Sequence, residues 1–111
     1  MKQDTLTIFS GLCLLILTSA LHAETPVFEI KIQNNLFLPS ELKIPAHTKI
    51  KLLIKNQDPT PEEFESYELN REKIIMGNSQ GIVFIGPLPP GIYPFFGEFH
   101  MQTALGKIIA Q

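Results

Sequence analysis

The sequence predicts an all-β domain, and three observations support that prediction. Short runs of alternating apolar and polar residues recur from about residue 27 onward, Pro, Gly, Asn or Asp residues separate them, and no segment carries a convincing helical stripe. Strands at roughly 8 to 12-residue spacing with turn signals between them are typical of a β-sandwich or barrel. We therefore expect one compact β-domain without a second domain.

The first predicted strand covers residues 27–32, which alternate regularly. A turn at residues 34–35 follows, and then a stretch at residues 36–45 whose two prolines suit an edge strand better than a central one. Residues 49–56 alternate lysine with aliphatic residues and predict another strand. The side chains expected to face inward from the two regular strands are Phe28, Ile30, Ile32, Ile50, Leu52 and Ile54.

The second half of the chain begins with an acidic segment, residues 62–73, which has too few apolar positions to bury a helical stripe. We expect it to be a short strand or irregular segment leading into residues 73–76. A turn at residues 77–81 and strands at residues 82–85, 92–96 and 107–110 complete the domain. The residues assigned to the core are Phe28, Phe37, Phe64, Met76, Phe84, Tyr93, Phe95 and Phe96.

The first 23 residues have the pattern of a secretory signal peptide. A positively charged start is followed by an apolar run at residues 7–17 and by small residues that end at Ala23. The run is shorter than the roughly 18 residues that a membrane-spanning helix needs. We expect cleavage after Ala23, a periplasmic location, and a domain at residues 24–111 that does not itself span the membrane.

The only cysteine, Cys13, lies inside this leader. Once the leader is removed, the chain has no disulfide, thiolate metal ligand or cysteine nucleophile. Eight basic and ten acidic residues remain without Lys2 and Asp4. This near balance gives no reason to expect nucleic acid or an anionic membrane surface as a partner.

The acidic residues are unevenly distributed, because six of those ten fall between Asp58 and Glu72. Glu63 and Glu65 are separated by one residue, so on an extended segment both carboxylates point to one face while Phe64 points to the core. From spacing alone, a solvated acidic edge that discourages aggregation is the simpler explanation. A metal site is the alternative.

Glu98 and His100 repeat the same spacing on a later loop. If that loop is extended, the two pairs converge at one end of the sandwich and supply three carboxylates and one imidazole. Such a set suits Fe²⁺, Fe³⁺, Mn²⁺ or Cu²⁺. His100 could instead be a structural histidine bonded to a backbone carbonyl, and Glu98 an exposed loop acid.

The order of several short motifs resembles the cupredoxins. These motifs are Phe37-x-Pro39, Leu42-x-Ile44-Pro45, Asn56-x-Asp58, Pro90-Gly91-x-Tyr93-x-Phe95 and a His-bearing loop that closes on Gly106-x-Ile108. The resemblance implies a cupredoxin-like Greek-key β-sandwich. More narrowly, Glu63-Phe64-Glu65-Ser66, Arg71-Glu72-Lys73 and Gly97-Glu98-x-His100-x-x-Thr103-Ala104 look like the small periplasmic cupredoxin-like protein that accompanies bacterial iron-permease uptake systems.

The resemblance also implies where blue-copper ligands would stand. The first histidine position falls at Glu62 or Glu63, the cysteine at Gly97, the second histidine at His100 and the methionine at Ala104. Only one of the four ligands, the second histidine, is retained. Because the thiolate defines a blue-copper centre, an electron carrier of that type is not expected.

We therefore expect a copper or iron ion held by Glu63, Glu65, Glu98 and His100. Glu62, Glu68, Glu72 and Met101 are weaker candidates. Glu68 and Glu72 could form a second acidic site or only surface ion pairs with neighbouring basic residues, and Met101 is more readily explained by packing.

These features predict a periplasmic accessory protein of a bacterial iron-uptake system. It would pass metal or electrons towards an inner-membrane iron permease and other periplasmic uptake components. One alternative is a copper-dependent ferrous-iron oxidase, although no acid, base or nucleophile pattern argues for catalysis beyond the metal. Another alternative is a metal-free interaction module that docks on a periplasmic or membrane partner.

Overall fold

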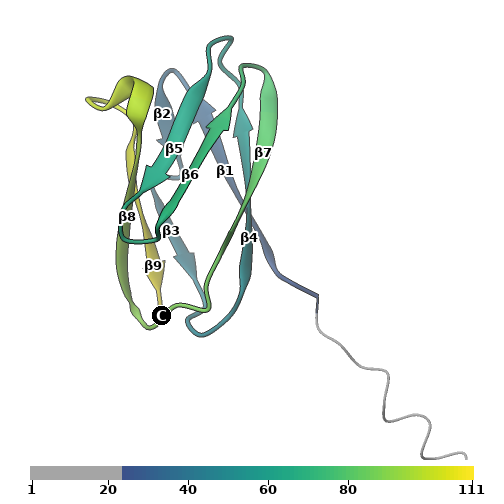
Figure 1. Ribbon diagram of the computed structural model, residues 1–111, viewed down its shortest axis with the longest axis vertical. Coiled ribbons are helices and arrows are strands. Elements are labelled where there is room, and N and C mark those ends of the chain that lie inside the picture. The colour runs from purple at the N-terminus through teal and green to yellow at the C-terminus, as the bar shows by residue number, and fades with distance from the viewer. Residues whose placement is uncertain (1–23) are drawn as a thin grey trace, which may run out of the picture.

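The computed structural model describes residues 24–111, which form a sandwich of two β-sheets (Figure 1). The first sheet has the strand order β2-β1-β4-β7 and the second has the order β3-β9-β8-β5-β6. The all-β prediction is confirmed. The elements are β1 (Val27–Gln33), β2 (Leu36–Leu38), β3 (Glu41–Ile44), β4 (Ile50–Asn56), β5 (Glu62–Ser66), β6 (Arg71–Ile75), β7 (Ser79–Ile85), β8 (Gly91–Gly97), the 3₁₀ helix η1 (Glu98–His100) and β9 (Leu105–Ala110).

The predicted signal peptide, residues 1–23 with Cys13, lies outside the described residues and stays a prediction. Within residues 24–111, no helix is long and apolar enough to cross a membrane.

The chain passes repeatedly between the two sheets, so strands distant in sequence become neighbours. β1 pairs with β4 in parallel and β3 pairs with β9 in parallel, whereas the other pairs are antiparallel. The inward faces predicted for β1 and β4 are confirmed, with Phe28 only partly buried. The loop with η1 extends from the end of β8, beside β5 (Figure 1).

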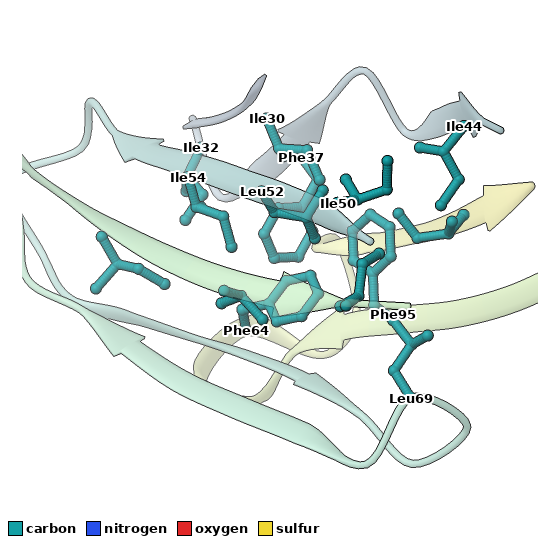
Figure 2. Close-up of a cluster of buried hydrophobic side chains, with 14 of the residues drawn as sticks. Ile30, Ile32, Phe37, Ile44, Ile50, Leu52, Ile54, Phe64, Leu69 and Phe95 are labelled. Carbon is teal, nitrogen blue, oxygen red and sulfur yellow. The ribbon is translucent and has the colours of Figure 1, made fainter. Parts of the chain in front are cut away.

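The core lies between the sheets and is centred on three phenylalanine rings (Figure 2). Phe37 packs edge to face against Phe95 at 5.0 Å and against Phe64 at 6.1 Å, and the last two rings are 5.0 Å apart. Such aromatic pairs contribute about 0.5–1.5 kcal/mol beyond their burial. Because both sheets and this continuous core lie within residues 24–111, that segment contains what it needs to fold on its own.

Three of the predicted core residues lie outside the core. Phe84 is 44% exposed, Met76 is 60% exposed, and Phe96 lies half-buried on the outer side of β8. Successive side chains of a strand point to opposite faces, so these residues point outward from positions next to a buried residue. Those buried neighbours are Ile75, Val83, Ile85 and Phe95.

The proline-containing stretch forms two short edge strands, β2 and β3, rather than one. The turn before them has positive φ angles at Asn34 and Asn35, which is typical of a two-residue hairpin turn. The backbone N–H groups of both asparagines donate to the Asp58 carboxylate at 2.8 and 2.9 Å. The Thr103 hydroxyl donates to the Asn35 carbonyl at 2.8 Å, which ties the η1 loop to the same turn.

Candidate metal centre

Strand β5 separates the acidic residues of the predicted site onto two faces. Glu62, Phe64 and Ser66 are buried, whereas Glu63 and Glu65 lie half-buried on the outer face, as the alternation predicted. Across the β5–β6 ladder, the Cα atoms of Glu65 and Glu72 are direct partners. Because directly opposite residues share a face of a sheet, the side chain of Glu72 joins the outer pair.

We call Glu63, Glu65, Glu72 and Glu98 the outer carboxylate cluster. One carboxylate oxygen from each of the first three lies within 4.8 Å of the other two. Glu98, at the start of η1, is hydrogen-bonded through its side chain to Glu65 and Glu63. The structure thus brings together three of the four residues predicted to bind metal, and Glu72 belongs to this cluster rather than to a separate site. Glu68 is exposed in the β5–β6 turn.

Hydrogen bonds between carboxyl groups require a shared proton, because an ionised carboxylate only accepts. The hydrogen bond to Glu98, followed by burial and by repulsion from the neighbouring acids, raises the pKa of Glu65 to about 7. The same leading causes raise the pKa of Glu63. The hydrogen bonds from Glu65 and then Glu63 lower the pKa of Glu98. Glu98 is therefore the charged acceptor, and the cluster retains a proton near neutral pH.

One oxygen of the cluster, Glu65 Oε1, is buried without a hydrogen-bond partner. A buried polar atom without a partner is unfavourable, and a bound cation would supply one. Oxygen ligands lie about 2.0–2.6 Å from such ions, so ligands on opposite sides of one ion are about 4–5 Å apart. The spacing of the three oxygens is therefore compatible with a single shared cation.

The inward residue Glu62 is held very differently. Its side chain is 1% exposed and accepts hydrogen bonds from the backbone N–H groups of Glu63 and Phe99, both at 2.9 Å. His100 Nδ1 lies 2.7 Å from Glu62 Oε2. Because an ionised carboxylate only accepts, Nδ1 carries the hydrogen, and Nε2 is the ring atom that could bind a metal.

Gly97 makes room for this buried pair. A Cβ atom at position 97 would lie 2.6 Å from the Cδ and Oε2 atoms of Glu62 and 2.7 Å from the Cβ of Ala104. Glu62, Gly97 and Ala104, with His100, occupy the four positions at which the resemblance places copper ligands. The structure therefore brings those positions together at one end of the sandwich, where the Glu62 carboxylate takes up the space beside Gly97.

The expectation that Glu98 and His100 point to one face is wrong. It assumed an extended loop, but η1 is a 3₁₀ helix, in which about three residues make a turn and side chains two apart diverge. Glu98 reaches the outer cluster and His100 reaches Glu62. Met101, which follows η1, is 55% exposed and does not pack in the core.

The Glu62–His100 bond was missed by sequence reasoning, although one signal for it was present. Glu62 stands two residues before Phe64, so the alternation that assigns Phe64 to the core also assigns Glu62 to the interior. A glutamate at an interior position requires donors nearby.

A sequence model of the cupredoxin-like domain matches residues 6–110 of the chain, and the chain belongs to that family. The uncharacterized protein RP394 of Rickettsia prowazekii (strain Madrid E) is 47% identical over 81 residues, or 73% of this chain. The matched region spans 65% of the length of that relative.

Two solved structures illustrate the similarity of fold. Auracyanin A, a "blue" copper protein from Chloroflexus aurantiacus, superposes with a TM-score of 0.68 at 15% identity, over 79% of this chain and 100% of that one. The metal-binding domain of the Cu(I)-exporting P-type ATPase CopA from Streptococcus pneumoniae D39 gives a TM-score of 0.65 at 14% identity, over 81% and 91% of the chains. At these identities the similarity shows the cupredoxin-like fold alone.

Proposed function

We propose that this protein binds a metal cation at the outer carboxylate cluster. The observation that supports this most directly is the convergence of Glu63, Glu65 and Glu72 within 4.8 Å, with Glu98 bonded to two of them. Clustered carboxylates repel one another unless a proton or a cation neutralises them. Oxygen donors of this kind suit hard or borderline cations such as Fe³⁺, Fe²⁺ and Mn²⁺ better than Cu⁺.

His100 Nε2 is proposed as a separate metal donor, because the His100 ring is bonded to Glu62 and is not part of the group of carboxylates that can share one cation. Histidines that bind metals commonly donate their other ring N–H to a carboxylate, which fixes the tautomer and raises the basicity of the ligand. The 2.7 Å contact between His100 Nδ1 and Glu62 has this arrangement. Glu62 would then orient the ligand and would not itself bind the metal.

The residues at the cupredoxin copper position do not fit a blue-copper centre. Gly97 and Ala104 have no donor atoms in their side chains, and the carboxylate of Glu62 fills the space next to them. A blue-copper site needs a thiolate with two imidazoles. We therefore assign no blue-copper electron transfer to this position.

In the cell, we propose a periplasmic accessory role in iron uptake, in which the cation is cargo handed towards an inner-membrane permease. Three features support this proposal: the signal-like sequence at residues 1–23, the motifs shared with the cupredoxin-like protein of iron-permease systems, and the oxygen-rich donor set. Copper is the alternative cargo, because auracyanin A is a blue copper protein and the CopA domain belongs to a Cu(I)-exporting ATPase.

Isothermal titration of residues 24–111 with Fe²⁺ under anaerobic conditions, chelated Fe³⁺, Mn²⁺ and Cu²⁺ tests the proposal. We expect saturable binding of one ion, accompanied by proton release near pH 7 because the cluster must lose its proton. The double variant Glu63→Gln, Glu65→Gln keeps the shape of both side chains and should lower the affinity at least about tenfold, the size of effect that even outer-shell partners of a metal have.

The matched control is Glu24→Gln, Glu41→Gln, which changes the net charge equally at exposed positions outside β5, β6 and η1. Equal affinity of both double variants would refute the site. Absence of binding for every ion would favour the metal-free interaction module instead. A His100→Gln variant, examined for weaker binding without loss of the folded state, tests the role of Nε2 separately.

A further inference from the structure

The outer face of the first sheet contrasts in charge with the outer carboxylate cluster on the second. Strands β1, β4 and β7 lie side by side in that sheet (Figure 1), and their outer face, together with Lys49 just before β4, carries four lysines among apolar side chains. We define the lysine face as Lys31, Lys49, Lys51, Lys55, Ile82 and Phe84. The near-zero net charge of the whole chain conceals this segregation.

The strand register shows that lysine and apolar side chains are interleaved. Lys51 of β4 is paired with Phe84 of β7, and Lys55 of β4 is paired with Lys31 of β1. Directly opposite residues share a face of the sheet. Lys49 Nζ lies 5.0 Å from the centre of the Phe84 ring, so this lysine covers the same face.

Most of the positive charge on this face is uncompensated. Lys55 pairs with Glu29 at 3.0 Å. Within residues 24–111, Lys31, Lys49 and Lys51 have no carboxylate within 4.0 Å. Four lysines and one glutamate therefore give the face an excess of positive charge, while the acidic cluster lies on the other sheet.

Two large apolar residues of the face are exposed to solvent. Ile82 is 42% exposed and Phe84 is 44% exposed, and both point away from the core. Lysines can lay their aliphatic stems along such residues while the ammonium groups reach outward. A face of this composition combines apolar burial with electrostatic attraction to a negatively charged surface.

We propose that the lysine face docks on a lipid bilayer surface that carries anionic headgroups. Charge complementarity favours this occupant, because each lysine close to an anionic leaflet strengthens binding. All the basic residues of the lysine face are lysines. The lysine ammonium is a point charge suited to a diffuse anionic layer, whereas arginine is preferred for bidentate recognition of one carboxylate or phosphate.

Docking in this way would also orient the molecule. The outer faces of a sandwich point in opposite directions, so the outer carboxylate cluster would face away from the anionic surface. The separation of charge favours that orientation before contact, because the field of the bilayer attracts one face and repels the other. The inference does not depend on the metal proposal.

Co-sedimentation of residues 24–111 with lipid vesicles tests the inference. We expect stronger partitioning onto equimolar phosphatidylcholine–phosphatidylglycerol vesicles than onto phosphatidylcholine alone. Binding should weaken when salt is raised from about 0.01 M to about 1 M, since the screening length falls from about 30 to about 3 Å. At about fivefold per lysine, Lys31→Glu, Lys51→Glu should reduce partitioning at least about 20-fold.

The control double variant is Lys43→Glu, Lys107→Glu, which makes the same charge change on strands β3 and β9 of the other sheet. At about 0.15 M salt, where the screening length is about 8 Å, we expect it to bind within about threefold of the parent, since charges beyond a screening length contribute little. Equal binding to neutral and anionic vesicles, or equal loss in both variants, would overturn the inference.

Self-association is the competing occupant, with the lysine face of one copy against the acidic cluster of another. Analytical ultracentrifugation that shows oligomers abolished by Lys31→Glu, Lys51→Glu, without any lipid binding, would overturn membrane docking in favour of that contact. If this variant does not fold, Lys31→Gln, Lys51→Gln applies the same comparison with a smaller expected loss.

Discussion

The two faces of strand β5 place the same side chain in opposite environments. Glu62 on the inner face is 1% exposed and has three hydrogen-bond donors, two backbone N–H groups and His100 Nδ1. The pKa values of Glu63 and Glu65 on the outer face are raised mainly by a hydrogen bond with the carboxyl group of Glu98. Both oxygens of the buried acid have partners, whereas Glu65 Oε1 on the outer face has none.

This difference shows that burial alone does not decide whether an acid destabilises a fold. A buried carboxylate is tolerated when fixed donors surround it, whereas neighbouring carboxylates must share a proton or bind a cation. The Glu62 carboxylate fills the space beside Gly97, where the resemblance places a copper ligand, and its hydrogen-bond donors are all protein groups. In the outer carboxylate cluster, Glu65 Oε1 has no hydrogen-bond partner, and a bound cation would supply one.

The largest expected effect comes from removing the inner acid. Glu62→Ala should lower the free energy of unfolding by about 3–5 kcal/mol, because it leaves His100 and the Phe99 N–H without their buried partner. Urea denaturation at neutral pH measures it. Glu63→Ala, one residue along the strand, is the control, and we expect a much smaller change. Equal losses would show that the two faces do not differ as described.

A second, smaller effect tests the space beside Glu62. Gly97→Ala places a Cβ 2.6 Å from the Glu62 carboxylate and should cost about 1–3 kcal/mol. Gly91→Ala at the other end of β8 is the control, because its nearest neighbour there is at 3.6 Å, an ordinary contact.

The same substitution distinguishes crowding by Glu62 from a general effect on the strand. In a Glu62→Ala background, Gly97→Ala should cost less, because the crowding carboxylate is gone. Strict additivity of the two changes would show that they are not in contact.

How much of this fold could be predicted from sequence depended on whether one face of a strand was clearly apolar. Residues 27–32 and 49–56 alternate, and their inward faces were predicted correctly. Residues 82–85 are all apolar, so alternation could not tell that Val83 and Ile85 point inward while Phe84 points outward. Phe95 and Phe96 present the same ambiguity, which the pairing with β5 and β9 resolves.

The site was predictable to the extent that it depends on local geometry. Glu63 and Glu65 share a face because strands have a period of two, and that part needed no tertiary information. Glu72 joins them through the register of the β5–β6 pair, and Glu98 through the 3₁₀ conformation of η1. Within η1, the Phe99 N–H donates a hydrogen bond to Glu62, which lies 37 residues earlier in the chain, so this contact could not be predicted from local sequence.

The smallest predicted effect is a pH dependence that originates on the outer face. The pKa of Glu65 rises from 4.5 to about 7 on folding, so between these values the folded state holds a proton that the unfolded state has released. Stability contributed by this group is present below about pH 4.5 and is lost as the pH rises through about 7. Urea denaturation across this window should show a midpoint that falls with pH in the parent chain.

Glu65→Gln should flatten this dependence, because the glutamine amide can donate to the Glu98 carboxylate at any pH. Glu62 supplies the contrast, since its donors are fixed protein groups and Glu62→Gln should leave the decline between pH 4.5 and 7 in place. A saturating cation should also reverse the decline, because it binds the deprotonated cluster and so favours the folded state increasingly as the pH rises. A decline that persists unchanged in the double variant Glu63→Gln, Glu65→Gln would place its origin outside the raised pKa values of the cluster and remove the distinction drawn between the two faces of β5.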